Sequence, residues 1–329
     1  MIRRNAQGQI DPAADAALLL RRIGFATLAV ALPLASLVSR RAAVVLTPIA
    51  VVLLVIAALI ESPRWFSETL KREVLSKPGL ILMGLAGWAL LSLVWSPYTF
   101  SATEKASHLL LAVALGFLGS AALPERMRAS NLNLAALGTA IAATFALGLI
   151  VFAAVRQDDT LAGSVERGIS VILIMAWPAL AWLLSRERGL SALGLALVVG
   201  LLALTRFQEG ETIAVICGAV AFGAVSANRR KASGMIAAIV ALLMLLAPIL
   251  PFLLIPIVSL FPDSSGDAVQ VLGVWADAVG RDPVKLFTGH GLDTVLRGRI
   301  TGMLPNTTPT TLLFETWYEL GIVGAATAS

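Results

Sequence analysis

The stretch AAVVLTPIAVVLLVIAALI, from Ala42 to Ile60, decides the fold class of this chain. It holds 19 consecutive residues without a charge, and an α-helix needs about 20 apolar residues to cross the hydrocarbon core of a bilayer. Its hydropathy does not alternate, as it would in a strand of a membrane β-barrel. The stretch therefore predicts a membrane-spanning helix.

The composition of the whole chain agrees with this prediction. Of 329 residues, 58% are hydrophobic and 14% are charged, whereas soluble domains are about one quarter charged. The net charge of +5 is scattered in small clusters between apolar runs, which favours membrane topology over a nucleic-acid partner. The single cysteine, Cys217, offers no disulfide, zinc or redox pair. We therefore expect a protein of the lipid bilayer, without nucleic acid, metal or organic cofactor.

Eight more apolar runs of similar length flank the first one. They lie at 23–38, 79–95, 105–123, 132–154, 169–185, 190–205, 212–226 and 234–260, and a tenth begins near residue 312. We predict an all-α, polytopic membrane protein of about ten transmembrane helices, a single domain over residues 1–329 with one long loop at 261–309. Fifteen of the 25 Lys and Arg lie on the side of the N-terminus, against six in the short loops opposite. The positive-inside rule then places the N-terminus in the cytoplasm and the long loop in the periplasm.

Within the long loop, apolar residues recur at helical spacing from Ala268 to Val279 and include Trp275. This pattern predicts a short amphipathic helix that lies on the membrane or on the helical bundle. The pattern fits two roles of this helix equally well, a lid over a site and a helix that only packs.

Four arginines gather at the predicted outer helix ends and in the long loop. Ionisable groups at membrane depth cost several kcal/mol unless they are paired or hydrated, so they mark candidate functional sites. A guanidinium group suits bidentate capture of phosphate, and converging arginines beside a lipid-accessible groove would bind a diphosphate-linked lipid. The alternative is that each one anchors an interface or pairs with a nearby glutamate. The four are Arg167, Arg206, Arg297 and Arg299.

Three further residues are candidates for acid–base chemistry. His290, between Gly289 and Gly291, is the only histidine of the long loop; it is either a general base or an incidental loop residue. Glu315 and Glu319 lie one turn apart on the last predicted helix and so share a face. They point into a polar cavity or form a structural pair with an arginine.

The order of short motifs along the chain carries a family resemblance. These are Trp95-Ser96-Pro97, Glu166-Arg167-Gly168, Thr205-Arg206, Trp275 followed by Asp282-Pro283 and Gly289-His290-Gly291, and Glu319-Leu320-Gly321-Ile322-Val323-Gly324. From about residue 80 onward, the chain resembles the O-antigen ligase and polymerase family of bacterial inner-membrane glycosyltransferases. The resemblance implies transfer of a glycan from a polyprenyl-diphosphate carrier to a lipid A–core sugar or a growing glycan, in lipopolysaccharide and polysaccharide biosynthesis.

The resemblance also implies roles for the candidate residues. The four arginines bind the diphosphate, and Arg167 and Arg206 stabilise its developing charge without a metal. We favour His290 as the general base and Glu315 as the group that orients it or pairs with an arginine, with Glu319 and Trp275 in support.

The chain departs from the family pattern in three places. Thr310 stands where ligases of the family carry a histidine, Val271 stands where they often carry an arginine, and the chain ends at Ser329, where they usually continue. We expect a divergent or C-terminally truncated member. Two alternatives remain, a catalytically inactive structural homologue and a transporter or flippase of lipid-linked sugars. Three prolines, at 248, 251 and 256, interrupt the ninth run, and interrupted helices are frequent in transporters.

Overall fold

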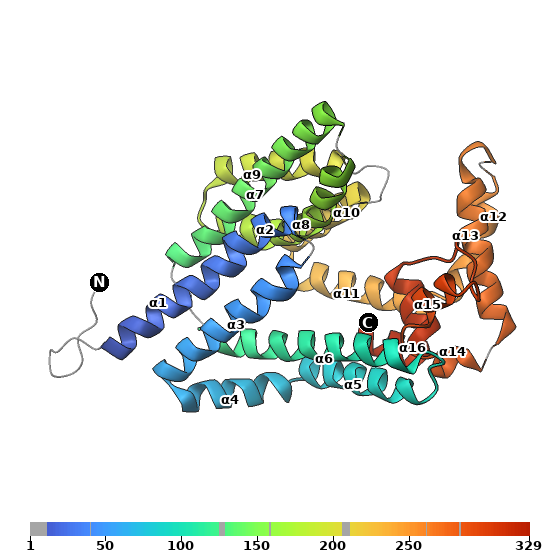
Figure 1. The fold of residues 1–329 in the computed structure, drawn as a ribbon. Coiled ribbons are helices and arrows are strands. Elements are labelled where there is room, and N and C mark those ends of the chain that lie inside the picture. The colour runs from blue at the N-terminus through green and yellow to red at the C-terminus, as the bar shows by residue number, and fades with distance from the viewer. Residues whose placement is uncertain are drawn as a thin grey trace. The chain divides into compact units, whose positions relative to one another are not determined.

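A computed structural model describes residues 12–39, 41–124, 129–157, 159–205, 211–260, 262–282 and 284–329. Every regular element in these ranges is a helix, so the predicted all-α class is confirmed (Figure 1). The chain divides into two compact units, one made of Met1–Lys71 and Leu115–Ala227 and the other of Arg72–Ala114 and Asn228–Ser329. The single domain expected over residues 1–329 stays a prediction.

The first unit contains most of the long helices. Its elements are α1 (Pro12–Ala26), the π-helical turn η1 (Thr27–Ala31), α2 (Leu32–Val38), α3 (Ala42–Glu61), most of α4 (Pro63–Val74), α7 (Ala129–Arg156), α8 (Asp159–Ser185), α9 (Gly189–Leu204), α10 (Glu211–Ala227) and the end of α6 (Thr99–Ala122). Helix α8 packs against α2, α7 and α9.

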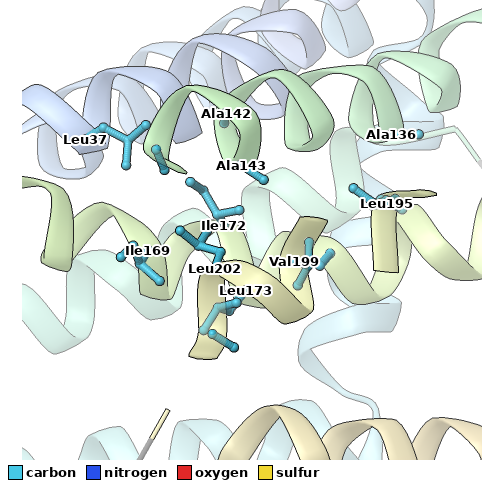
Figure 2. Packing of buried hydrophobic residues seen from close by; sticks show 14 of the residues in the cluster. Leu37, Ala136, Ala142, Ala143, Ile169, Ile172, Leu173, Leu195, Val199 and Leu202 are labelled. Atoms are coloured by element: carbon cyan, nitrogen blue, oxygen red, sulfur yellow. The ribbon is translucent and has the colours of Figure 1, made fainter. Parts of the chain in front are cut away.

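The core of the first unit combines large aliphatic side chains from one helix with alanines from another. Ile169 and Ile172 of α8 are fully buried and lie in one cluster with Ala142 and Ala143 of α7 (Figure 2). Lipid tails are as apolar as these side chains, so helices in a bilayer associate mainly through close packing, and small residues permit that closeness. The alanine face of α7 is therefore what brings α8 near.

An ion pair joins α1 and α3. The Nη2 atom of Arg21 lies 2.5 Å from Oε2 of Glu61; the Arg21 side chain is 8% exposed and the Glu61 side chain 39%. Loss of Glu61 would leave the buried guanidinium group without its counter-charge, so the pair favours the observed register of the two helices.

The second unit holds the elements around the candidate site. They are α5 (Lys77–Leu91), the 3₁₀ turn η2 (Ser92–Val94), the start of α6, α11 (Arg229–Leu246), α12 (Leu250–Val258), α13 (Pro262–Arg281), α14 (Lys285–Thr288), α15 (Thr294–Ile300) and α16 (Leu312–Ala328). Helix α16 packs against α5, α11, α14 and α15. The amphipathic helix predicted from Ala268 to Val279 is part of α13.

Six helices of the described residues are long and apolar enough to cross a membrane, and a bent pair brings the number to seven. The other runs differ from simple spans: Gly189–Leu204 and Thr212–Ala227 are shorter, and α11 and α12 meet at an angle of 91°. The bend has a local cause, because Pro248 has no N–H to donate to the carbonyl of Met244 four residues earlier. The count of ten spans and the periplasmic position of residues 261–309 stay predictions.

Gly138 of α7 tests the close packing of the first unit. A Cβ atom at this position would collide with the backbone carbonyl of Ala29 in η1, whereas Gly148 on the same helix has nothing within 4 Å. We expect Gly138→Ala to lower the free energy of unfolding by about 1–3 kcal/mol through overpacking. Gly148→Ala should leave it unchanged or raise it slightly, because Ala favours a helix over Gly. Thermal unfolding in detergent measures both variants, and equal midpoints would contradict the packing described.

Candidate functional site

A break in α16 organises the candidate site. Gly321 has φ 65° and ψ −160°, values that interrupt the helix and favour glycine. The three carbonyls before the break accept hydrogen bonds from outside the helix. Tyr318 O accepts from His290 N at 2.8 Å, Glu319 O from Gly291 N at 3.0 Å, and Leu320 O from Trp88 Nε1 at 2.8 Å. The break thereby joins α5, the segment after α14, and α16.

Gly289 and Gly291 allow the segment around His290 to approach these backbones. Both have positive φ, and a Cβ at Gly289 would collide with the carbonyl of Glu319. A Cβ at Gly291 would lie 2.6 Å from the Cα of Ser96. The Ser96 hydroxyl donates to Leu292 O at 2.9 Å. Three of the motifs that carry the family resemblance, at 95–97, 289–291 and 319–321, thus meet in the second unit.

The ring of His290 is held in one orientation. Its Nδ1 lies 3.0 Å from Tyr318 O, and because a carbonyl can only accept, Nδ1 carries the hydrogen and the neutral ring keeps its lone pair on Nε2. The ring also stacks on Tyr318, with centroids 4.0 Å apart and an interplanar angle of 5°. Tyr318 O therefore orients His290; Glu315, for which this role is one of two predictions, lies near Lys105.

Burial lowers the pKa of His290 below its usual 6.5. The hydrogen bond to Tyr318 O raises this pKa, the positive charge of Lys285 lowers it, and the negative charge of Asp282 raises it, but burial is the largest of the four causes. At pH 7 the imidazole is neutral and able to accept a proton.

His290 also lines a pocket of about 310 Å³, including its part open to solvent. The pocket lies where the α11–α12 bend meets α13, α14 and α16. Trp275, predicted to support the site, forms part of its wall. The lining combines aromatic rings with groups able to form hydrogen bonds, and includes Trp275, Trp317, Tyr318, Asp282, Lys285 and His290.

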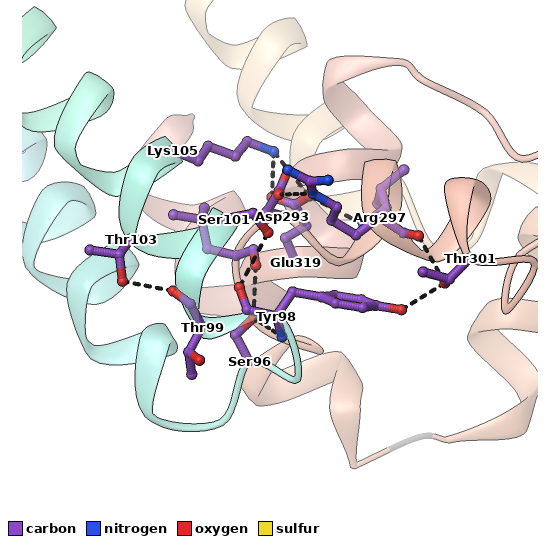
Figure 3. A network of polar contacts seen from close by, with 12 residues as sticks. Ser96, Tyr98, Thr99, Ser101, Thr103, Lys105, Asp293, Arg297, Thr301 and Glu319 are labelled. Carbon is purple, nitrogen blue, oxygen red and sulfur yellow. Dashed lines mark hydrogen bonds and ion pairs between the residues drawn. The ribbon is translucent and has the colours of Figure 1, made fainter.

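A second polar cluster surrounds Glu319 (Figure 3). Its side chain is 4% exposed, and Lys105 Nζ of α6 lies 3.0 Å from Oε1 and 2.8 Å from Oε2. The backbone N–H of Val295 also donates to Oε1, at 3.4 Å. Glu315 lies 3.9 Å from Lys105, so both glutamates face the same ammonium group, as their spacing predicts. Their partner is a lysine and not an arginine.

Sequence reasoning did not single out Lys105. The only available signal is a lone cation nearly two turns after the start of a largely apolar helix, and nothing in the local sequence connects it to a carboxylate 214 residues away.

The two loop arginines are close in sequence, but each has its own partner in the structure. Arg297 Nε lies 3.4 Å from Asp293 Oδ2, and Arg299 Nη2 donates to Asn306 O at 2.9 Å. Arg167 belongs to α8 of the first unit, and its side chain lies outside the description, as does all of Arg206. The convergence of the four arginines stays a prediction. Thr310, which stands where the family that the chain resembles carries a histidine, is exposed just before α16.

The pair of Lys105 and Glu319 can be tested by a double-mutant cycle. Lys105→Met should destabilise the protein, because it leaves a buried carboxylate without its counter-charge. Glu319→Gln in the Lys105→Met background should recover a large part of the loss, since the buried negative charge is then gone. Thermal unfolding of the four proteins gives the coupling, and additive effects would show that the two side chains do not interact. Lys77→Met, at the start of α5, is the control and should change little.

Comparison with known proteins returns no matching family model, no matching curated protein and no matching solved structure. The chemistry of the site therefore has to be inferred from its own side chains, foremost the neutral imidazole of His290 beside the aromatic pocket.

Proposed function

We propose that this chain is a membrane glycosyltransferase of the O-antigen ligase or polymerase type. It transfers a glycan from a polyprenyl-diphosphate carrier to a sugar hydroxyl. The observation that supports this proposal is the state of His290: Nδ1 donates to Tyr318 O, the lone pair is on Nε2, and burial keeps the ring neutral beside a pocket. These are the properties of a general base.

In the proposed reaction, His290 Nε2 takes the proton of the acceptor hydroxyl. The hydroxyl oxygen bonds to the anomeric carbon of the donor glycan as the bond from that carbon to the diphosphate oxygen breaks. The polyprenyl diphosphate leaves with the bonding electron pair. Guanidinium groups of Arg167 and Arg206, assisted by Arg297 and Arg299, stabilise the charge that develops on it.

We also propose the membrane in which the protein lies and the face on which it acts. Ten spans with a cytoplasmic N-terminus put residues 261–309 on the periplasmic face of a bacterial inner membrane, where His290 would meet the carrier-linked glycan. The charge asymmetry of the loops supports this orientation.

Transport of lipid-linked sugars is the second candidate function, and the interrupted helices favour it. The bend of 91° between α11 and α12 and the break of α16 at Gly321 lie in the same unit. Transporters often place substrate sites at such interruptions. Purified protein in vesicles separates the two functions: a transferase forms a new glycosidic bond, whereas a flippase moves the labelled lipid between leaflets without forming one.

The proposed orientation predicts which segments are outside the cytoplasm. Alkaline phosphatase fused after Asp277 should be active, because the enzyme folds only when exported, and fusion after Lys231 should be inactive. Phosphatase activity of whole cells at matched fusion levels measures this. The opposite pattern would overturn the orientation.

The proposed base predicts both a loss of activity and a pH profile. His290→Ala should lower in vitro transfer by about two orders of magnitude, the usual range for general-base catalysis. Since burial holds the pKa of His290 below 6.5, the wild-type rate should be flat around pH 7–8 and fall only as acidification protonates the ring below that value.

His108→Ala is the matched control, because His108 is exposed on α6, and it should transfer normally. If His290→Ala also transfers normally while Thr310→His raises the rate, His290 is not the base.

A further inference from the structure

We infer that helix α12 lies inside the hydrocarbon core of the membrane and runs along the bilayer plane, with lipid acyl chains around its exposed sides. This position does not depend on the proposed reaction. Four features of the second unit lead to it: the length of α11, the angle at the bend, the composition of α12 and the hydrogen bonds of the backbone at the bend.

Helix α11 ends before it has crossed the membrane. Its charged end is Arg229–Lys231, and its apolar part runs from Ala232 to Leu246. These are about 15 residues, which at about 1.5 Å each cover about 22 Å, whereas the hydrocarbon core is about 30 Å thick. With the charged end at one boundary, the bend lies about 8 Å short of the other. A tilt of α11 would leave it shorter still.

Helix α12 does not complete the crossing. It meets α11 at 91°, so it runs along the membrane plane when α11 runs along the membrane normal. The stretch from Ala232 to Pro262 carries no charge, and its length of about 31 residues exceeds the need of a straight span by about 11. The nine residues of α12 account for most of this excess.

Helix α12 has no polar face. Its sequence is LPFLLIPIV, whereas a helix that lies on the membrane surface turns a polar face to water. Phe252, Leu253 and Leu254 point in directions about 100° apart and are 51%, 57% and 37% exposed. Apolar side chains therefore point outward over more than half of the helix circumference, while α13 packs beside α12 (Figure 1). Such a surface fits acyl chains and not water.

The backbone at the bend is hydrogen-bonded within the protein. In hydrocarbon, each unpaired N–H or C=O group costs several kcal/mol. Pro248 has no N–H group to satisfy, and Ile249 N donates to Leu246 O at 2.8 Å. The carbonyl of Met244, which Pro248 leaves without a helical partner, accepts from the indole of Trp317. The bend therefore meets the condition for a helix interruption at membrane depth.

Two charged residues support the same depth. Pro248, at the bend, lines the pocket of His290 together with Asp282 and Lys285. Charged side chains at membrane depth are stable where they reach water or polar headgroups, and the headgroup region begins at the boundary that the bend approaches. His290 is thereby placed near the depth of the lipid headgroups, on the face of the membrane opposite Arg229–Lys231.

The test places a nitroxide spin label at three successive positions of the full chain in phosphatidylcholine nanodiscs. Phe252→Cys, Leu253→Cys and Leu254→Cys are made in a Cys217→Ser background, which removes the single cysteine. Molecular oxygen, which concentrates in hydrocarbon, should relax all three labels several-fold more than a water-soluble nickel chelate does. Arg230→Cys, at the exposed start of α11, is the control and should show the opposite preference.

The three positions separate immersion from the other arrangements. A helix on the membrane surface would turn at least one of them to water, so preference for the chelate at any one would overturn the inference. A helix covered by protein, such as a second copy of this chain, would shield the labels from both reagents, and that result would overturn it too.

A measurement on the unmodified chain removes any dependence on the substitutions. Phosphatidylcholine with a photoactivatable diazirine in its acyl chain, irradiated in the same nanodiscs, should attach to the peptide that contains Leu250–Val258. The span Ala42–Glu61 is the positive control for labelling from the hydrocarbon. Labelling of that span without labelling of Leu250–Val258 would show that α12 lies outside the acyl chains.

Discussion

The break of α16 at Gly321 is the constraint on which the candidate site depends. A buried carbonyl without a hydrogen bond is costly, so the carbonyls freed by the break need donors. His290, Gly291 and Trp88 supply them. The same demand explains why the indole of Trp317 bonds the carbonyl of Met244 opposite Pro248. The carbonyls at the two helix interruptions thus accept hydrogen bonds from indole and backbone N–H groups. The pocket lies where the two interruptions meet.

The charged and titratable groups of the second unit form two sets, the structural ion pairs and the groups around His290. Lys105 of α6 neutralises the buried Glu319 of α16, and the N–H of Val295 in α15 donates to the same carboxylate, so Glu319 links the three helices. The pair of Arg297 and Asp293 is local to α15. Burial keeps His290 neutral, and the nearby charges of Lys285 and Asp282 oppose each other. The structural pairs and the proposed base are therefore distinct, and the base does not depend on a carboxylate to orient it. A backbone carbonyl fixes its tautomer instead.

The position of His290 bears on the proposed reaction, because Thr310 stands where the family that the chain resembles carries a histidine. The imidazole of His290 comes from a different part of the chain, and its orientation is set by the backbone of α16. In the proposed reaction the leaving group is a diphosphate, which departs readily when its charge is stabilised. The proposal therefore asks only a moderate contribution of the base, and a single oriented imidazole is enough for it.

The sequence by itself determined the helical class, the apolar character of the spans, the amphipathic helix around Trp275, and the shared face of Glu315 and Glu319. Each of these follows from a local period or a local run of hydropathy. Only the tertiary structure decided that Glu319 pairs with Lys105, that Tyr318 orients His290, and that α11 and α12 meet at a sharp angle. Hydropathy does not encode these pairings, because the association of helices in a bilayer depends on packing and hydrogen bonding between residues far apart in the chain.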